Sequence, residues 1–359
     1  MIHISNFVEI ICRILGIIQY GSLADKVNRL KSVAAICIPL PVLIFYLYTI
    51  VICLQSNERL EYSHVLVLFS NWANFIVKYV WYLIKRNGIK KFLLDMNEFD
   101  INSHKILGNV DGYKNVIYLF LAFYLYSLTT EIIFSEVLIN SWNFAIPYAS
   151  NIFEFLLHYA ILCDVQPKFK IINQKFKKFK LEIEMKTASP TTAKLDQINN
   201  MEHISITHCE LSKLVMDANE LLTLPFLLIF SSYLAMLIDT TYMLVKFFSR
   251  KQIVVGFFLK STNWMIFATV NLILEIHIWN RIAVEANKTS IYIHTIWNTY
   301  AKRKMVDINV NHLKLISTRL LNTKLNLTAL GFFKIDWALL HTIAATLTTY
   351  LIILIQLGL

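Results

Sequence analysis

The chain has 359 residues, of which 56% are hydrophobic and only 16% are charged. That balance argues against a soluble globular domain and is typical of an integral membrane protein. The formal net charge of +10 would suggest nucleic acid as a partner of a soluble protein, but in a membrane protein it indicates basic cytoplasmic loops, so we expect a lipid bilayer as partner and no nucleic acid.

The first 32 residues combine an amphipathic stretch with a basic end. Phe7, Ile10 and Ile14 recur at helical spacing, and Lys26 and Arg29 follow them. We therefore predict a cytoplasmic or interfacial N-terminal segment over residues 1–32. An interfacial helix, a re-entrant segment and a frayed leader all remain open.

Seven apolar segments follow, each long enough to cross a hydrocarbon core of about 30 Å as a helix. They cover residues 33–54, 62–84, 116–139, 144–165, 222–248, 257–280 and 338–359. The chain has only eight Gly and six Pro, which favours long and mostly uninterrupted helices. The sequence thus predicts an all-α membrane protein with seven transmembrane helices.

The basic residues are distributed unequally between the two ends of these helices. The N-terminal segment and three long loops (85–115, 166–221 and 281–337) hold 28 of the 34 Lys and Arg residues. Because cytoplasmic loops are enriched in Lys and Arg, we expect the N-terminus in the cytoplasm. Seven crossings then place the C-terminus outside the cell.

The long loops are patterned as helices rather than as flexible tails. Phe169, Ile172 and Phe176 recur at helical spacing among lysines, so the helix of the fourth segment should continue beyond the membrane. Residues 201–222 and 282–327 should also be largely helical, and Ser189-Pro190 marks a break at 187–194. The predicted domains are the N-terminal segment (1–32), a bundle of six transmembrane helices with long cytoplasmic loops (33–280), a cytoplasmic helical anchor region (281–337) and a seventh transmembrane helix (338–359).

Ionisable residues within the apolar segments are candidates for function. Lys78 lies toward the cytoplasmic end of the second segment, so its side chain should extend to the interface. Glu154 and His158 are four residues apart and should pair on one face of the fourth segment.

Aromatic and amide residues gather in the outward halves of several segments. They suit a cavity for a mostly apolar molecule that carries a few hydroxyl groups. The ligand-binding candidates are Trp72, Glu131, Phe134, Tyr148, Asn151, Asp239, Tyr242, Asn263 and Trp264.

The last segment has a polar-flecked face. Thr349, Tyr350, Ile353, Gln356 and Leu357 share one side of a helix that carries no Lys, Arg, Asp or Glu from residue 338 onward. A hydroxyl, a phenol and an amide would be costly against lipid, so this side should face protein or water.

The same residues carry a resemblance to a known family. Thr349-Tyr350, five apolar residues and Gln356 match the terminal signature of insect gustatory receptors, with Leu357 in place of the usual Phe. Gly331-Phe332-Phe333 and Ile335-Asp336 resemble the family's approach to its last helix. The chain is therefore identified as similar to these seven-helix chemoreceptor channels.

The resemblance implies a ligand-gated, non-selective cation channel in the plasma membrane of a sensory dendrite. Four copies of the last helix, in a homotetramer or a heterotetramer with related receptors, would surround a pore for cations. Ile353 and Leu357 would form closing rings, Gln356 a ring of amides, and Thr349 and Tyr350 would lie deeper. Family sugar receptors often have an acidic residue where Leu351 stands, so a bitter or plant compound is favoured, and a sugar such as fructose is possible.

Two other classes fit a seven-helix chain. A G-protein-coupled receptor would need an outside N-terminus, which the charge distribution opposes. A secondary transporter would favour internal repeats with broken helices, and Pro39, Pro41 and Pro225 show no evident pairing between the halves.

The sequence carries no enzyme signature. It lacks a Gly-rich phosphate loop and a Gly-x-Ser-x-Gly motif, and its five cysteines are not spaced as metal ligands. We expect no enzymatic activity, no cofactor and no metal.

Overall fold

A computed structural model describes residues 62–108, 122, 124–126, 129, 138–185, 191–250, 255–303, 308–322 and 324–356. The predicted N-terminal segment and first apolar segment lie outside these residues, as does most of the third. The described helices and strands are, in order, α4 (Tyr62–Leu107), α6 (Leu138–Met185), α7 (Thr191–Arg250), α8 (Val255–Lys302), α9 (Ile308–Asn322), β1 (Thr328–Ala329), β2 (Phe333–Lys334) and α10 (Trp337–Gln356).

Four helices are much longer than a membrane is thick. They contain 46, 48, 60 and 48 residues, which at about 1.5 Å per residue is about 70 to 90 Å. The prediction that the helix of the fourth apolar segment continues past residue 165 is confirmed, because α6 ends at Met185. The break predicted at 187–194 is shorter than expected, since α7 already begins at Thr191.

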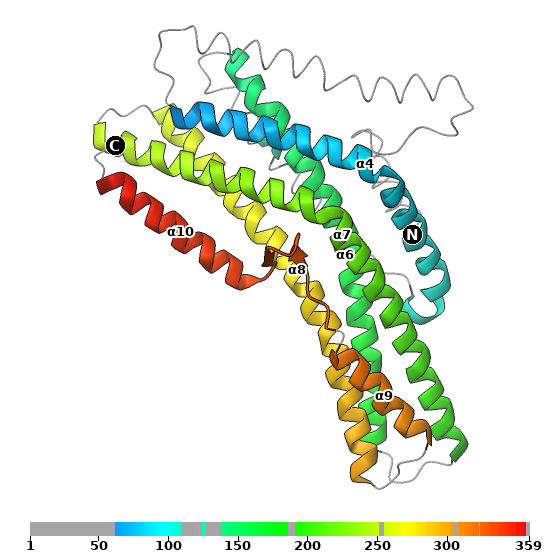
Figure 1. Cartoon of the computed structure of the whole chain (residues 1–359). Helices are drawn as coiled ribbons and strands as arrows, with labels where there is room; N and C mark the ends of the chain where they lie inside the picture. The colour runs from blue at the N-terminus through cyan, green and yellow to red at the C-terminus, as the bar shows by residue number, and fades with distance from the viewer. Residues whose placement is uncertain are drawn as a thin grey trace, which may run out of the picture.

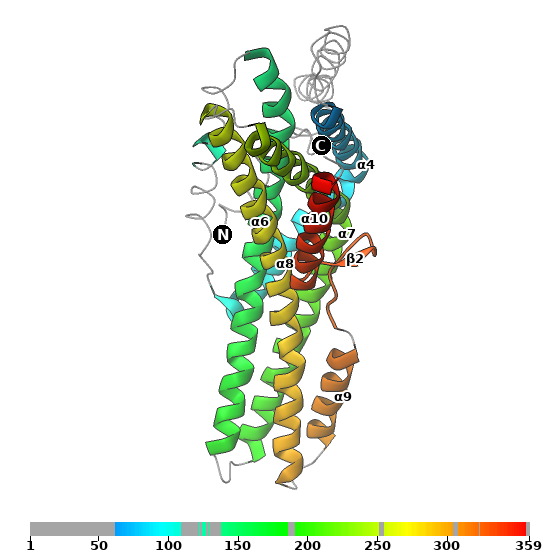
Figure 2. The same ribbon diagram turned by 90° about the vertical axis from the view of Figure 1, so that its left-hand side faces the viewer.

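The extensions form an elongated stalk. The C-terminal parts of α6 and α8 run beside the N-terminal part of α7, with α9 along the side of α8 (Figures 1 and 2). Phe169, Ile172 and Phe176 are fully buried in this stalk, while the interleaved Lys170 and Lys177 are exposed. The helical pattern of the sequence is thus explained by one face that packs and one face that meets solvent.

At the other end of the molecule the helices spread apart. Figure 1 shows α4 and α7 changing direction along their course, and α10 lying along α7 and α8. Pro225 lies inside α7, where it cannot donate a backbone hydrogen bond, so a bend is expected there. Among the described residues, one helical segment, Ile198–Val245 within α7, is both long enough and apolar enough to cross a membrane, and Trp337–Ile353 is a shorter apolar helix.

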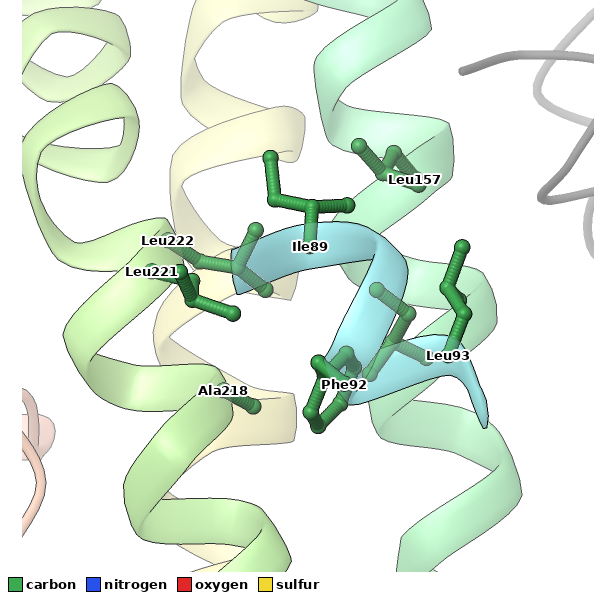
Figure 3. A pocket seen from close by; sticks show the side chains of 8 residues that line it. Ile89, Phe92, Leu93, Leu157, Ala218, Leu221 and Leu222 are labelled. Carbon is green, nitrogen blue, oxygen red and sulfur yellow. The ribbon is translucent and has the colours of Figure 1, made fainter. Parts of the chain in front are cut away.

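Between the two ends, α4, α6 and α7 meet around a small apolar cavity. Its volume is about 10 Å³, and Ile89, Phe92, Leu157 and Leu222 are among its lining residues (Figure 3). An apolar space of that size has no polar partners for a water molecule and stays dry. It is a packing defect of the core, and it does not resemble a ligand site.

Candidate functional site

The terminal helix α10 touches the rest of the chain along only one side. Ile343 is buried, and Leu339, Leu340 and Leu347 are partly buried against the core. The rest of its surface is open, and toward the end of the helix Tyr350, Ile352 and Ile353 are exposed by 42%, 50% and 46%. A helix without charge that leaves this much apolar surface uncovered must meet lipid or another chain.

The threonines of α10 satisfy their own hydroxyl groups. The hydroxyls of Thr342, Thr346, Thr348 and Thr349 each donate to the carbonyl four residues earlier, at 2.8 to 3.1 Å. A hydroxyl bonded in this way can face hydrocarbon without leaving a group unpaired. Thr349 is exposed, but it therefore adds little to the polarity argument, which depends on the exposed Tyr350 and Gln356.

A short hairpin leads into α10. β1 and β2 pair in antiparallel fashion, and the turn between them places Leu330 and Gly331 at φ values of 50° and 77°. Such positive values suit glycine, which has no Cβ to clash with its own backbone. Asp336 then caps the helix, because its Oδ1 accepts from the N–H of Ala338 at 3.0 Å.

The hairpin is fixed to α7 and α8 by side chains. The Thr223 hydroxyl donates to the Thr328 carbonyl at 3.0 Å and accepts from the Leu330 N–H at 2.6 Å. Asn287 binds both the N–H and the carbonyl of Leu325, at 2.8 and 3.0 Å. The start of α10 is therefore held at two places by the helices of the bundle.

A buried group of polar residues joins α4, α6 and α8, and we call it the polar layer. It consists of Lys78, Asn151, Glu154, His158, Asn271 and Glu275. Lys78, Glu154 and Asn271 each lie 16 residues after the first residue of their helix, so the three helices present the layer at a common depth.

Lys78 does not extend to the interface, which contradicts the prediction. It is 1% exposed, and its Nζ lies 2.9 Å from Glu154 Oε2 and 2.5 Å from Asn151 Oδ1. The ion pair holds the ammonium inside, because a carboxylate and an amide oxygen replace the water that it would otherwise seek.

The predicted pairing of Glu154 with His158 is also wrong. Glu154 pairs with Lys78, while His158 Nδ1 lies 3.3 Å from Glu275 Oε1. Glu154 remains in electrostatic contact with both His158 and Glu275. The two pairs thus form one coupled network that sequence spacing along a single helix could not reveal.

The predicted ligand-binding residues occupy two levels. Asn151 belongs to the polar layer, whereas Trp72 and Trp264 are buried six and seven residues closer to the starts of α4 and α8 than Lys78 and Asn271. Trp72 meets Phe75, and Trp264 meets Phe267, which also contacts Tyr124 and Tyr233. An aromatic level therefore lies next to the charged one.

The remaining predicted residues are less informative. Asp239 is buried on α7, and Tyr242 and Asn263 are half-buried. Tyr148 lies on α6, but its side chain is outside the described part, and Glu131, Phe134 and Leu357 lie outside the described residues.

Sequence reasoning did not include Asn271 or Glu275 among the binding candidates. Glu275 is 2% exposed, and its Oε1 lies 3.3 Å from His158 Nδ1 on α6. The signal that could have identified the pair is their spacing of four residues within a predicted transmembrane segment.

The model of the 7tm chemosensory receptor family matches residues 6–359. Two Drosophila melanogaster proteins are similar to parts of the chain. Gustatory receptor 28b is 31% identical over 147 residues, and the match covers 39% of this chain and 30% of that relative. Gustatory receptor 28a is 28% identical over 206 residues, which is 54% of this chain and 44% of that relative. The chain thus matches less than half the length of either relative.

Two solved structures share the fold. The insect olfactory receptor OR5 from Machilis hrabei in complex with eugenol has a TM-score of 0.71 and 13% identity, with 99% of both chains covered. A second structure of the same receptor has a TM-score of 0.67, 14% identity and the same coverage. At these identities the likeness establishes the arrangement of helices alone.

Proposed function

The chain belongs to the 7tm chemosensory receptor family, and from that premise we propose that it is a gustatory receptor acting as a ligand-gated, non-selective cation channel. Members of this family are membrane proteins, and we place this one in the plasma membrane of a sensory dendrite. A small tastant opens it, either a bitter or plant compound or a sugar such as fructose. The observation that carries the proposal is the uncovered, uncharged side of α10.

Four chains surround the pore in this proposal, as a homotetramer or with related receptors. The open side of α10 then faces the shared axis, with Ile353 and Leu357 as apolar rings that exclude water when closed. Gln356 offers permeating cations an amide oxygen that binds them only weakly. Support comes from the exposure of Ile353 and Gln356 in a single chain, which leaves both free for neighbours.

Gating connects the bundle to α10 through the hairpin. The Thr223 hydroxyl on α7 accepts a hydrogen bond from the Leu330 N–H of the hairpin. The ring of His277 on α8 packs against the ring of Trp337, with 5.6 Å between the ring centroids. A ligand among the bundle helices that binds the open form better than the closed one shifts the population toward the open pore.

The N-terminus and the stalk lie in the cytoplasm in this proposal. Two glycosylation sequons begin at Asn287 and Asn326. The side-chain amide nitrogen of Asn287, to which a glycan would be attached, donates to the Leu325 carbonyl, so Asn287 is not available for glycosylation in the folded chain. Asn326 is exposed. A glycan on Asn326 in expressed protein would contradict the orientation, and an unmodified Asn326 agrees with it.

Current recording from cells that express this chain alone tests the proposal. Gln356→Ala should change conductance or ion selectivity, because the amide ring is lost. Ile353→Ala should produce leak without ligand, since a smaller ring excludes water less well. Leu347→Ala alters the packed side of α10 and serves as the control, and an unchanged pore in both test variants would reject the pore-lining role.

A further inference from the structure

The polar layer contains more hydrogen-bonding atoms than the described chain satisfies. Asn271 and His158 are 0% exposed, and Asn151 and Glu275 are 2% exposed. Within the part of the chain that the structure describes, Asn271 Oδ1, Glu275 Oε2, His158 Nε2 and Asn151 Nδ2 have no hydrogen-bond partner. Burial without a partner is costly for each of these atoms, so a cluster of four indicates that something else binds there.

The amide orientations in the layer are fixed by their bonds. Asn151 Oδ1 accepts from Lys78, which leaves its Nδ2 as a free donor. Asn271 Nδ2 donates to the Phe267 carbonyl at 2.7 Å, which leaves its Oδ1 as a free acceptor. Glu275 Oε1 accepts a hydrogen bond from the Nδ1–H of His158, so the Oε2 of Glu275 remains as a second acceptor.

This mixture of free donors and acceptors fits hydroxyl groups. A hydroxyl both donates and accepts, so one group can bond Asn271 Oδ1 or Glu275 Oε2 while a neighbouring group accepts from Asn151 Nδ2. A metal cation fits poorly, because Lys78 neutralises Glu154 and the described residues hold no group of three or more His, Cys, Asp or Glu side chains placed to bind one. An anion fits poorly as well, since two of the free atoms are oxygen acceptors.

The surroundings favour an apolar or ring-shaped body on the hydroxyl-bearing molecule. Phe267 lies one helical turn before Asn271 on α8, and Trp264 and Tyr233 pack edge-on against it, at 5.4 and 6.3 Å. A ligand could therefore place its ring among these aromatic side chains while its hydroxyls reach the polar layer.

We propose that the polar layer is the recognition site for adjacent hydroxyl groups of a small neutral ligand, supplied by a phenol or by a sugar. This inference rests on the proposed receptor function and names the ligand chemistry. Asn271 and Glu275 accept from the ligand hydroxyls, and Asn151 donates to them. Lys78 and Glu154 hold Asn151 in position.

Binding is measured as the ligand-induced rise in melting temperature of the purified full chain in detergent. The probes are catechol and D-fructose, each with its O-methylated counterpart, which keeps the carbon skeleton but cannot donate a hydrogen bond. At least one hydroxylated probe should stabilise the protein, and its methylated partner should not. A response to catechol alone identifies the phenolic source, and a response to fructose alone identifies the sugar source.

Asn271→Leu and Glu275→Gln should each weaken the binding of that probe about tenfold, the size expected for one lost hydrogen bond. Asn219→Leu is the matched control, because its buried Oδ1 is also without a partner in the described chain. It lies about 22 Å from Asn271 along the helices, counted at about 1.5 Å per residue from the contact of Phe226 with Trp279. A melting temperature without ligand that matches the wild type shows that each variant folds.

The proposal is overturned if neither hydroxylated probe stabilises the protein, or if methylation makes no difference, since the layer then holds water only. It is also overturned if Asn271→Leu binds as tightly as the wild type. Because this assay needs no current, binding that depends on Asn271 in a chain that conducts no ions would reject the channel and keep the site. Currents evoked by a ligand without hydroxyls and unaffected by Asn271→Leu would reject the site and keep the channel.

Discussion

At the scale of single residues, the polar layer shows how this protein keeps a lysine in its interior. Lys78 and Glu154 are 1% exposed and paired at 2.9 Å, with Asn151 as a further partner. A buried ion pair of this kind contributes little net stability compared with apolar residues in its place. Removing only one partner is strongly destabilising, because the other charge then stays buried without compensation.

Lys78→Met should therefore lower the free energy of unfolding by about 3 to 5 kcal/mol, because it leaves the Glu154 carboxylate buried without its cation. The double variant Lys78→Met with Glu154→Gln should recover most of that loss. The stability of both variants is measured from thermal melting of the purified protein, with the loss of folded protein followed by size-exclusion chromatography. A double variant as unstable as the single one would show that the pair is not the reason for the loss.

A second residue, His208, should make the stalk sensitive to acid. Burial lowers the pKa of His208 to about 4, although its Nε2–H donates to the Ala286 carbonyl at 3.0 Å. Its Nδ1 has no partner in the described chain and lies beside the Phe169 ring, so a second proton is unfavourable there.

Because the folded pKa is below the ordinary value of about 6.5, the unfolded chain binds the proton more readily. The contribution of His208 to the free energy of unfolding is complete above about pH 6.5. It is lost as the pH drops toward 4, and the loss is at most about 3 kcal/mol. Melting temperatures at pH 7 and pH 5 measure the effect. His208→Gln keeps a donor for Ala286 but does not titrate, so it should lose less stability than the wild type over that interval.

At the scale of elements, the hairpin between α9 and α10 connects the bundle to the terminal helix. One hydroxyl, that of Thr223, serves both the Thr328 carbonyl and the Leu330 N–H. Phe333 in β2 packs against Phe230 of α7 at 5.4 Å. The position of α10 therefore depends on α7 as well as on its own sequence.

Thr223→Val should loosen the hairpin while leaving the helices intact. The change keeps the side-chain shape but removes both hydrogen bonds, at a cost of about 1 to 3 kcal/mol. Hydrogen exchange of residues 324–336 should become faster, and exchange within α6 should not change. Thr318→Val, an exposed position whose hydroxyl bonds only to the Lys314 carbonyl, is the control.

The long helices and their packed faces could be predicted from local pattern, whereas their partners could not. The spacing of Phe169, Ile172 and Phe176 predicted a helix beyond the membrane, because burial on one face leaves a period in the sequence. Glu154 and His158 share a helix face, yet each bonds a residue on a different helix. Such contacts depend on how helices are arranged, and that arrangement leaves no periodic signal in one chain.

At the scale of the whole molecule, the chain has two different halves. In the stalk α6, α7, α8 and α9 lie side by side (Figure 2), and a groove of about 320 Å³ opens between α7 and α9. The other half holds the polar layer, the aromatic level and an α10 that is open along one side. In the channel that we propose, the stalk anchors the subunits to one another, and the open half binds the ligand and lines the pore.

The terminal motif led to the family, and the family match covers nearly the whole chain. The motif could suggest a pore, but it could not indicate how α10 is held. Ile353 and Gln356 are exposed in the single chain. They can line a pore only if the α10 helices of other chains lie beside them.

The most direct measurement is the structure of the full chain assembled in a lipid bilayer disc, determined by electron cryomicroscopy. We expect four chains with their α10 helices around one axis, and with Ile353 and Gln356 facing that axis. An assembly in which this side of α10 is covered by lipid, or in which residue 359 lies on the same side of the membrane as the stalk, would contradict it.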